Sequence, residues 1–528
     1  MRNREEDRIH AGVAGHRVTR RVLLKSAYLS LAAAIPVLQA CSGQGAQSGG
    51  PSETKSQAPA APAKGKYNGA ELRYAGLGTM GEALENQAKP WLESHGVKFV
   101  RAQFGQQELE EKILQAMATN TYLADLIQFN ANSAGDVMGG GFLLEVSPET
   151  KKAVDMDDVL PLYRDRILSW QGKQYALPYD GDKHMLAFLG DLFANQENRA
   201  KFKAKYGFDL PSDGRMTWQE HRQIAEFFTG SDWNGNSKPD EAGIAHMTKR
   251  KDTAWWGFNS RAAAYVKHPE DPGVHFDVET FEPRINNPGF VRVLTEWKEE
   301  LEKFGLAGAT DMKWSESGEA FRGGRVAMSV GWWGVAESDP SRSVIHETVR
   351  YAILPGSTEV YNAQAGRWDT VADANFAPFI AFGGWVLAVP KNSKNPELAF
   401  EFASHIAGPE MSLHMVTNPT GAQPFRHSHL SSVTPWTEGN VKMDKAVAES
   451  YLAAEKATME HQNLMVDLRI PGFTQYRDTA ELAIAQALAG ELSPQDALNA
   501  CADSWKEITG RLGGVERQRE LYRAAINA

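Results

Sequence analysis

The sequence predicts an α/β fold of two lobes, each a sheet flanked by helices, with a ligand cleft at the hinge between them. Strand and helix patterns alternate over residues 71–130, and strand patterns return at 350–355 and 383–390 after a long, mainly helical middle. A chain of 528 residues is long enough to form more than one hydrophobic core. Because α/β material recurs after an insertion, we expect the chain to cross between two lobes more than once, which makes a hinge.

The first elements follow from the spacing of apolar residues. Strands are expected at 71–78, 98–104 and 124–130, and helices at 80–96 and 106–120. This order is typical of a parallel sheet with helices on its faces. Ligands bind outside the carboxyl ends of such strands, where the loops Gly76–Thr79 and Asn130–Ser133 fall.

The later elements complete the lobes. A helix is expected over residues 395–408, because Asn395 and Pro396 are typical of a helix start and Gly408 is typical of a helix end. Two more helices are expected over 474–512, and Cys501 in the second of them is interpreted as a small buried apolar residue. The expected boundaries are 67–178 and 350–408 for the N-terminal lobe, and 179–349 and 409–528 for the C-terminal lobe.

The N-terminus has the pattern of an export signal, residues 1–41. Paired Arg20 and Arg21 precede an apolar run that is too short to span a bilayer. The stretch TRRVLLK is similar to a twin-arginine signal, and the ending LQAC resembles a bacterial lipobox, in which Cys41 would carry lipid. A plain secretory signal with a chance cysteine is the alternative. Residues 42–66 contain almost no large apolar group, which predicts a disordered tether.

Bulk composition excludes several classes of protein. The net charge of −10 disfavours general attraction to nucleic acid or anionic lipid, so neither is expected as a partner. Two cysteines rule out a disulfide framework and a cysteine-rich metal site. No HExxH, GxSxG or GxxxxGK[ST] motif occurs in a recognisable context.

Several segments, in a shared order, resemble the bacterial extracellular solute-binding proteins of family 1, the sugar-binding components of ABC importers, including the maltose-binding type. The segments are ADLIQFNANSAGDVMGGGFLLEVSPE (124–149), GKQYALPYDGDKHMLAFLGDLF (172–193), FRGGRVAMSVGWWG (321–334), GGWVLAVPKNSKNPELAFEFASHIAGPEM (383–411) and TGAQPFR (420–426). The resemblance implies a periplasmic binding protein fold of type II and a lipid-anchored monomer, located in the periplasm or at the cell surface. It also implies capture of a carbohydrate, with an oligosaccharide expected, and delivery to an ABC permease. The chain is longer than typical members, mainly through 200–320, so the ligand cannot be copied from the family.

Adjacent tryptophans are the candidate ligand platforms, because a flat aromatic surface matches the C–H face of a sugar. Side chains leave a strand on alternate faces, so one indole of Trp332 and Trp333 can anchor in the lobe while the other faces the cleft. Packing of both rings in the lobe is the alternative. We also assign Trp385 after a double glycine and the pair Trp255 and Trp256 to the binding site, against packing in the interior.

Polar candidates for hydrogen bonds to hydroxyl groups follow the expected strands. They are Asn132, Asp180, Asp182 and Arg426, each of which also suits a turn or a solvated surface. A glycoside hydrolase would show similar tryptophans and carboxylates, and a sugar-sensing receptor not coupled to import would bind in the same way. No catalytic residue is assigned, and no cofactor is expected to be required.

The stretch DWNGNSKPDEAG resembles a calcium-binding loop. Oxygen ligands would come from Asp232, Asn234, Asn236, the Lys238 carbonyl and Asp240, at positions 1, 3, 5, 7 and 9. The loop lacks glycine at position 6 and glutamate at position 12, and Glu241 is a possible substitute for the latter. We expect either a structural calcium site or an Asn-Gly-rich surface turn.

Overall fold

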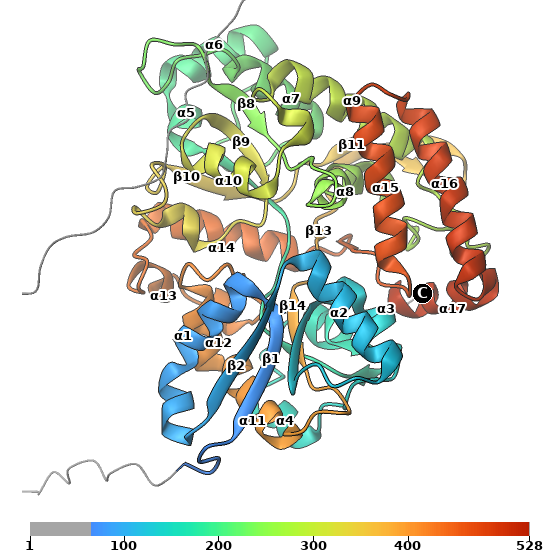
Figure 1. Ribbon diagram of the computed structural model, residues 1–528. Helices are drawn as coiled ribbons and strands as arrows, with labels where there is room; N and C mark the ends of the chain where they lie inside the picture. The colour runs from blue at the N-terminus through green and yellow to red at the C-terminus, as the bar shows by residue number, and fades with distance from the viewer. Residues whose placement is uncertain (1–64, 527–528) are drawn as a thin grey trace, which may run out of the picture. The chain divides into compact units, whose positions relative to one another are not determined.

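The computed structural model describes residues 65–526, which contain two main sheets (Figure 1). The expected signal and Cys41 lie outside these residues, as does all but the end of the expected tether. Residues Gly65 and Lys66 already belong to the folded part, since the Lys66 ammonium lies 2.9 Å from the Glu401 carboxylate.

The first sheet is the expected parallel one, extended by two antiparallel strands. Its order is β2 (Lys98–Phe104), β1 (Glu71–Leu77), β3 (Leu126–Asn130), β14 (Trp385–Ala388) and β6 (Leu177–Pro178). Strand β1 pairs in parallel with β2 and β3, and β14 runs antiparallel to β3 and β6. Its helices are α1 (Gly78–His95), α2 (Gln106–Thr119), α3 (Ala134–Val137), α4 (Pro148–Ala153), α11 (Pro396–Ala407) and α12 (Pro409–Val416).

Helix α1 shows why the spacing of apolar residues predicted a helix. Leu84, Ala88 and Leu92 recur at a spacing of four residues and are buried, so one stripe of the helix faces the sheet. Gly96 ends the helix at φ +67°, a conformation that a residue with a Cβ adopts at a cost. The apolar periodicity therefore predicts the helix, and Gly96 predicts where it ends.

The second sheet is mixed. Its order is β10 (Val349–Ala352), β7 (Met185–Leu189), β9 (Val326–Gly331) and β8 (Ala242–Ala245). The helices around it are α5 (Gly190–Ala194), α6 (Gln196–Tyr206), α7 (Trp218–Phe228), α8 (Ala254–Val266), α9 (Pro288–Phe304), α10 (Trp314–Arg322) and α14 (Lys445–Met459). Because β10 pairs with β7, the expected lobe boundary at residue 350 is wrong. The sequence of a short apolar strand does not indicate which sheet the strand joins.

The remaining elements connect or cover the lobes. They are the ribbons β4 (Ser169–Trp170) with β5 (Lys173–Gln174), β11 (Ser357–Asn362) with β12 (Arg367–Asn375), and β13 (Phe379–Ile380) with β15 (Met465–Val466), and the helices α13 (Thr434–Thr437), α15 (Phe473–Leu488), α16 (Pro494–Arg511) and α17 (Gly514–Ile526). Helices α15 and α16 lie side by side (Figure 1). Cys501 is buried on α16, as expected.

The chain passes between the two lobes three times. It crosses from β6 to β7, from β10 back to β14, and from α12 to α14. Two glycines let the crossing segments touch through their main chains. A Cβ on Gly384, at φ +88°, would lie 1.9 Å from the Asp180 carbonyl oxygen, and one on Gly181 would lie 2.2 Å from that of Pro424.

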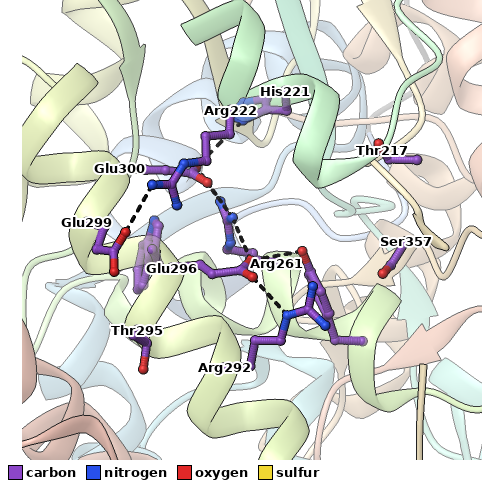
Figure 2. Close-up of polar contacts among 12 residues, drawn as sticks. Thr217, His221, Arg222, Arg261, Arg292, Thr295, Glu296, Glu299, Glu300 and Ser357 are labelled. Carbon is purple, nitrogen blue, oxygen red and sulfur yellow. Dashed lines mark hydrogen bonds and ion pairs between the residues drawn. The ribbon is translucent and has the colours of Figure 1, made fainter. Parts of the chain in front are cut away.

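The second lobe contains a buried ion pair network on α8 and α9 (Figure 2). The Arg261 guanidinium donates two hydrogen bonds of 2.6 Å to the Glu300 carboxylate, and both side chains are almost fully buried. Glu296 adds a longer contact of 3.4 Å to the same guanidinium. On the outer face, Arg222 pairs with Glu299 at 2.9 Å, with both side chains partly exposed.

Candidate functional site

A cavity of about 330 Å³ lies where the crossing segments meet the loops of both sheets. Residues of the first lobe that line it follow β1, begin α2 or begin β14. Residues of the second lobe follow β9 or belong to α10 and the start of α8. The lining includes Leu77, Thr79, Met80, Gln106, Asp182, Thr253, Trp314, Arg322, Trp332, Glu337, Phe382, Trp385, Asn418 and Gln423. The loop after β1 therefore reaches the cavity as expected, whereas Asn130–Ser133 does not.

The two adjacent tryptophans after β9 have opposite environments. Trp333 is fully buried, donates its indole N–H to the Ser329 carbonyl at 3.3 Å, and packs against Phe321. Trp332 lines the cavity and stacks on Phe382 with ring centroids 4.7 Å apart. Its Nε1 has no hydrogen-bond partner among the described residues. One indole thus anchors in the lobe while its neighbour lines the cavity.

Two carboxylates lie together at the first crossing. Asp182 lines the cavity, and Asp180 lies beneath it, where Oδ1 accepts a hydrogen bond of 2.7 Å from the Gln423 amide. The Gln423 side chain also donates to the Trp333 carbonyl at 2.7 Å and accepts from the Lys183 amide at 2.9 Å. Gln423 therefore joins the third crossing to the first crossing and to the end of β9.

Burial shifts both carboxyls toward the protonated form. It raises the pKa of Asp180 to about 7, partly offset by the Gln423 amide. Burial and the neighbouring Asp180 raise the pKa of Asp182 well above 3.8. Because like charges this close titrate together, burial and mutual repulsion both favour the form of the pair that holds a proton. Such a pair can both accept and donate hydrogen bonds to a hydroxyl group.

This pair predicts a pH dependence of stability. Between pH 3.8 and about 7 the folded chain holds protons that the unfolded chain has lost, so the free energy of unfolding falls as pH rises. The slope from one such proton reaches about 1.4 kcal/mol per pH unit. Asp182→Asn removes one of the two titrating carboxyls and should make the profile measured by urea unfolding less steep over this range, whereas Asp503→Asn, at an exposed position on α16, should not. Parallel profiles for the wild-type chain and Asp182→Asn would contradict this.

Several lining residues were not predicted from the sequence. Arg322 pairs with Glu337 at 3.1 Å, and Glu337 also accepts from the Gly334 amide at 3.0 Å, so these charges compensate one another. Trp314 lies edge-on to Trp332 at 5.5 Å. Phe382 has a positive φ of 59°, which is uncommon for a bulky residue and places its ring between the lobes.

The pair Trp255 and Trp256 does not line the cavity, which corrects the expectation. Every residue of α8 is buried, so the helix has no face left for a ligand. Both indole N–H groups donate to the buried carboxylate of Asp467, at 2.9 and 2.7 Å. Asn132 donates to the same carboxylate at 3.3 Å and is fully buried. These three predicted ligand contacts instead meet on one internal carboxylate that joins the lobes.

Arg426 is also internal, against the expectation. Its guanidinium is fully buried and donates to the main-chain carbonyls of Val154 at 2.6 Å, Asp155 at 3.0 Å and Ala407. Asp158 lies 3.3 Å away as its acidic partner. The side chain fixes the loop after α12, and no part of it lines the cavity.

The predicted calcium loop lies between α7 and β8 and folds its polar side chains inward. Asp232 Oδ1 accepts from the amides of Gly235 and Asn236, at 2.8 and 3.1 Å. The Asn236 amide group lies 3.4 Å from Asp240 Oδ1. Glu241, next in the chain, is 3% exposed, and neither carboxylate oxygen has a hydrogen-bond partner among the described residues.

Two features are absent from residues 65–526. No helix there is both long enough and apolar enough to cross a membrane. Within the same range, no three or more His, Cys, Asp or Glu side chains are grouped so that they could hold a metal ion. The loop at 232–240 contains two carboxylates, and its other possible oxygen ligands are amide and carbonyl oxygens.

Comparison with known proteins identifies the family and similar folds. A family model described as bacterial extracellular solute-binding protein matches residues 86–448. The mannitol-binding protein of Pseudomonas aeruginosa is 22% identical over 419 residues, 77% of this chain and 86% of that protein. An ABC transporter solute-binding protein of Agrobacterium radiobacter K84, solved with ribitol, has a TM-score of 0.66 at 19% identity, covering 84% of this chain and 99% of that chain. Maltose-bound MalE3 of T. maritima has a TM-score of 0.63 at 17% identity, covering 83% and 100%. The structural likenesses show a shared two-lobed α/β fold.

Proposed function

Because the chain belongs to the bacterial extracellular solute-binding proteins, we propose that it captures a carbohydrate between its lobes and delivers it to the permease of an ABC transporter. The observation that carries this proposal is the cavity itself. Trp332, Trp314, Phe382 and Trp385 supply aromatic surface, and Asp182 supplies a polar group for hydroxyls. Because the lining comes from both lobes, closure and ligand affinity are coupled.

The size of the cavity favours a small ligand. About 330 Å³ lies at the low end of the range for small-molecule sites, which suits a polyol or monosaccharide better than the expected oligosaccharide. A relative named for mannitol and a structure solved with ribitol support the same chemical class.

The proposal is tested by calorimetry of the purified chain with mannitol, ribitol, a hexose, maltose and a longer maltodextrin. Saturable binding with the ligand recovered unchanged supports a binding protein. Released products would identify a hydrolase instead, and binding to none of the panel would overturn the carbohydrate assignment. Uptake of the bound ligand, lost on deletion of the gene, separates import from sensing alone.

Anchoring to the membrane is part of the proposal. Cys41 follows the lipobox-like LQA, so the mature chain would carry lipid at its first residue and reach the permease on its tether. Mass spectrometry of the N-terminal peptide from native membranes tests this. A Cys41→Ser chain should appear in the soluble fraction, and unchanged membrane association would contradict lipidation at this residue.

We also propose that the loop from Asp232 to Asp240 binds calcium in a structural role. Support comes from the oxygen spacing of the loop and from the buried Glu241 carboxylate beside it, whose charge has no partner among the described residues. Ser237, at position 6, has φ +63°, the backbone conformation for which glycine is usual at that position.

Calcium should therefore stabilise the chain. At a concentration 100 times the Kd, a ligand that binds only the folded state adds about 2.7 kcal/mol to the free energy of unfolding. Thermal unfolding of chelator-treated protein should shift upward with calcium, and Asp232→Ala and Glu241→Gln should reduce the shift. Asp213→Ala, in another exposed loop of the same lobe, is the matched control. No shift in the wild-type chain would refute the site.

A further inference from the structure

A second cavity, of about 170 Å³, shares no residue with the first. Arg166, from the segment before β4, forms one wall, and Lys267 and His275, after α8, form another. The remaining wall consists of the segment between α14 and α15, which contains β15 and Arg469, together with the end of α17. The cavity thus borders both lobes.

Three cations line this cavity, and none of them forms an ion pair with a described residue. The Arg469 guanidinium donates to main-chain carbonyls, including those of Ala131 at 3.0 Å and Arg166 at 2.6 Å. The Lys267 ammonium donates to the carbonyl of Asp271 at 2.9 Å. Arg166 forms no hydrogen bond through its buried Nε within the part of the chain described. In a chain of net charge −10, such a cluster is an unusual concentration of positive charge.

The acidic groups nearby, Asp467 and Asp271, offset this charge only in part. Asp467 also lines the cavity, but its carboxylate already accepts from two indoles and from the Leu468 amide at 2.8 Å. The Asp271 carboxylate is paired with Arg284 at 2.7 Å. Burial lowers the pKa of His275 to about 3, so its ring is neutral. Burial and the nearby Arg166 lower the pKa of Arg469 to about 9, which leaves it protonated at pH 7.

We propose that this cavity binds a small oxyanion of the size of inorganic phosphate, held by the Arg166 guanidinium and the charges of Lys267 and Arg469. A guanidinium with unoccupied donors matches an oxyanion's paired oxygens, and the low local polarity strengthens the attraction. The Tyr522 hydroxyl, which accepts from the Val274 amide at 3.0 Å, has its own proton available for a further hydrogen bond.

An anion here would connect the two lobes at a cavity separate from the ligand cavity, to which it is linked by the hydrogen bond of 3.3 Å from the Phe382 amide to the Asp467 carboxylate. Arg166 precedes the first crossing, and Lys267 follows α8 of the second lobe. Binding that differs between open and closed forms would change the affinity of the main cavity, and the coupling would be reciprocal.

Calorimetry with inorganic phosphate and with sulfate, at constant ionic strength set by chloride, tests the site. We expect one phosphate per chain and at least a tenfold loss of affinity in Arg166→Gln. Arg164→Gln is the matched control, because Arg164 lies two residues away and pairs with its neighbour Asp165 at 2.7 Å. Lys267→Met is the second variant, should Arg166→Gln not fold, and the thermal unfolding temperature reports folding of each.

The outcomes separate clearly. Phosphate binding that Arg166→Gln or Lys267→Met weakens, and Arg164→Gln does not, supports the site. Unchanged affinity in the first two variants, or no binding of phosphate or sulfate to the wild-type chain at millimolar concentration, overturns it. Neither result depends on whether the first cavity binds a carbohydrate.

Discussion

Replacing Trp332 by alanine is expected to weaken carbohydrate binding at least tenfold, whereas replacing its neighbour Trp333 is expected mainly to destabilise the fold. Tenfold in affinity is about 1.4 kcal/mol, a modest fraction of what a ring and an indole donor contribute at a ligand site. Trp333 is fully buried, so its removal leaves a cavity in the second lobe and costs about 3–5 kcal/mol.

Two measurements distinguish the roles. Urea unfolding reports the free energy of unfolding, and calorimetry reports affinity for whichever ligand the panel identifies. Trp332→Phe is the informative intermediate, because it retains an aromatic face but removes the indole N–H that has no partner among the described residues. If both alanine variants lost stability equally and bound ligand as tightly as the wild-type chain, neither indole would belong to the site.

Replacing Glu300 by glutamine should be among the most destabilising single changes in the second lobe. It would leave the buried Arg261 cation with Glu296, at 3.4 Å, as its only carboxylate partner, and losing one partner of a buried pair costs about 3–5 kcal/mol. Glu299→Gln on the same helix removes the partly exposed pair with Arg222, which is worth about 0–1 kcal/mol (Figure 2).

The reason for the large effect can be tested in the same series. In a chain that carries both Arg261→Met and Glu300→Leu, no buried charge is left without a partner, so most of the stability should return. Urea unfolding at one pH compares the four chains. Equal, small losses for Glu300→Gln and Glu299→Gln would show that burial does not amplify the inner pair.

The sequence predicted elements well where one stripe or one face is buried. The apolar spacing in α1 is a local property, so predicting this helix needs no knowledge of neighbouring elements. Which sheet β10 joins is decided by pairing with β7, more than 150 residues earlier in the chain, and no local pattern records it.

The candidate site was likewise predicted only in part from the sequence. Alternation along a strand predicted that Trp332 and Trp333 would face opposite ways, and the structure places them so. The same reasoning failed for Trp255 and Trp256, because they lie on a helix that is apolar almost all round, a pattern typical of a buried helix. The role of Arg426 could not be predicted, since an arginine that binds main-chain carbonyls and one that binds a ligand can have the same local sequence.

The buried position of Cys501 makes the protein convenient to convert into an optical reporter. The chain contains two cysteines, and a soluble form that starts after Cys41 keeps one. Burial raises the pKa of the Cys501 thiol, so the reactive thiolate is scarce and shielded from reagents. A cysteine introduced at Thr79, exposed at the rim of the first cavity, would therefore take a thiol-reactive fluorophore selectively. Its emission would then follow occupancy of the cavity in real time.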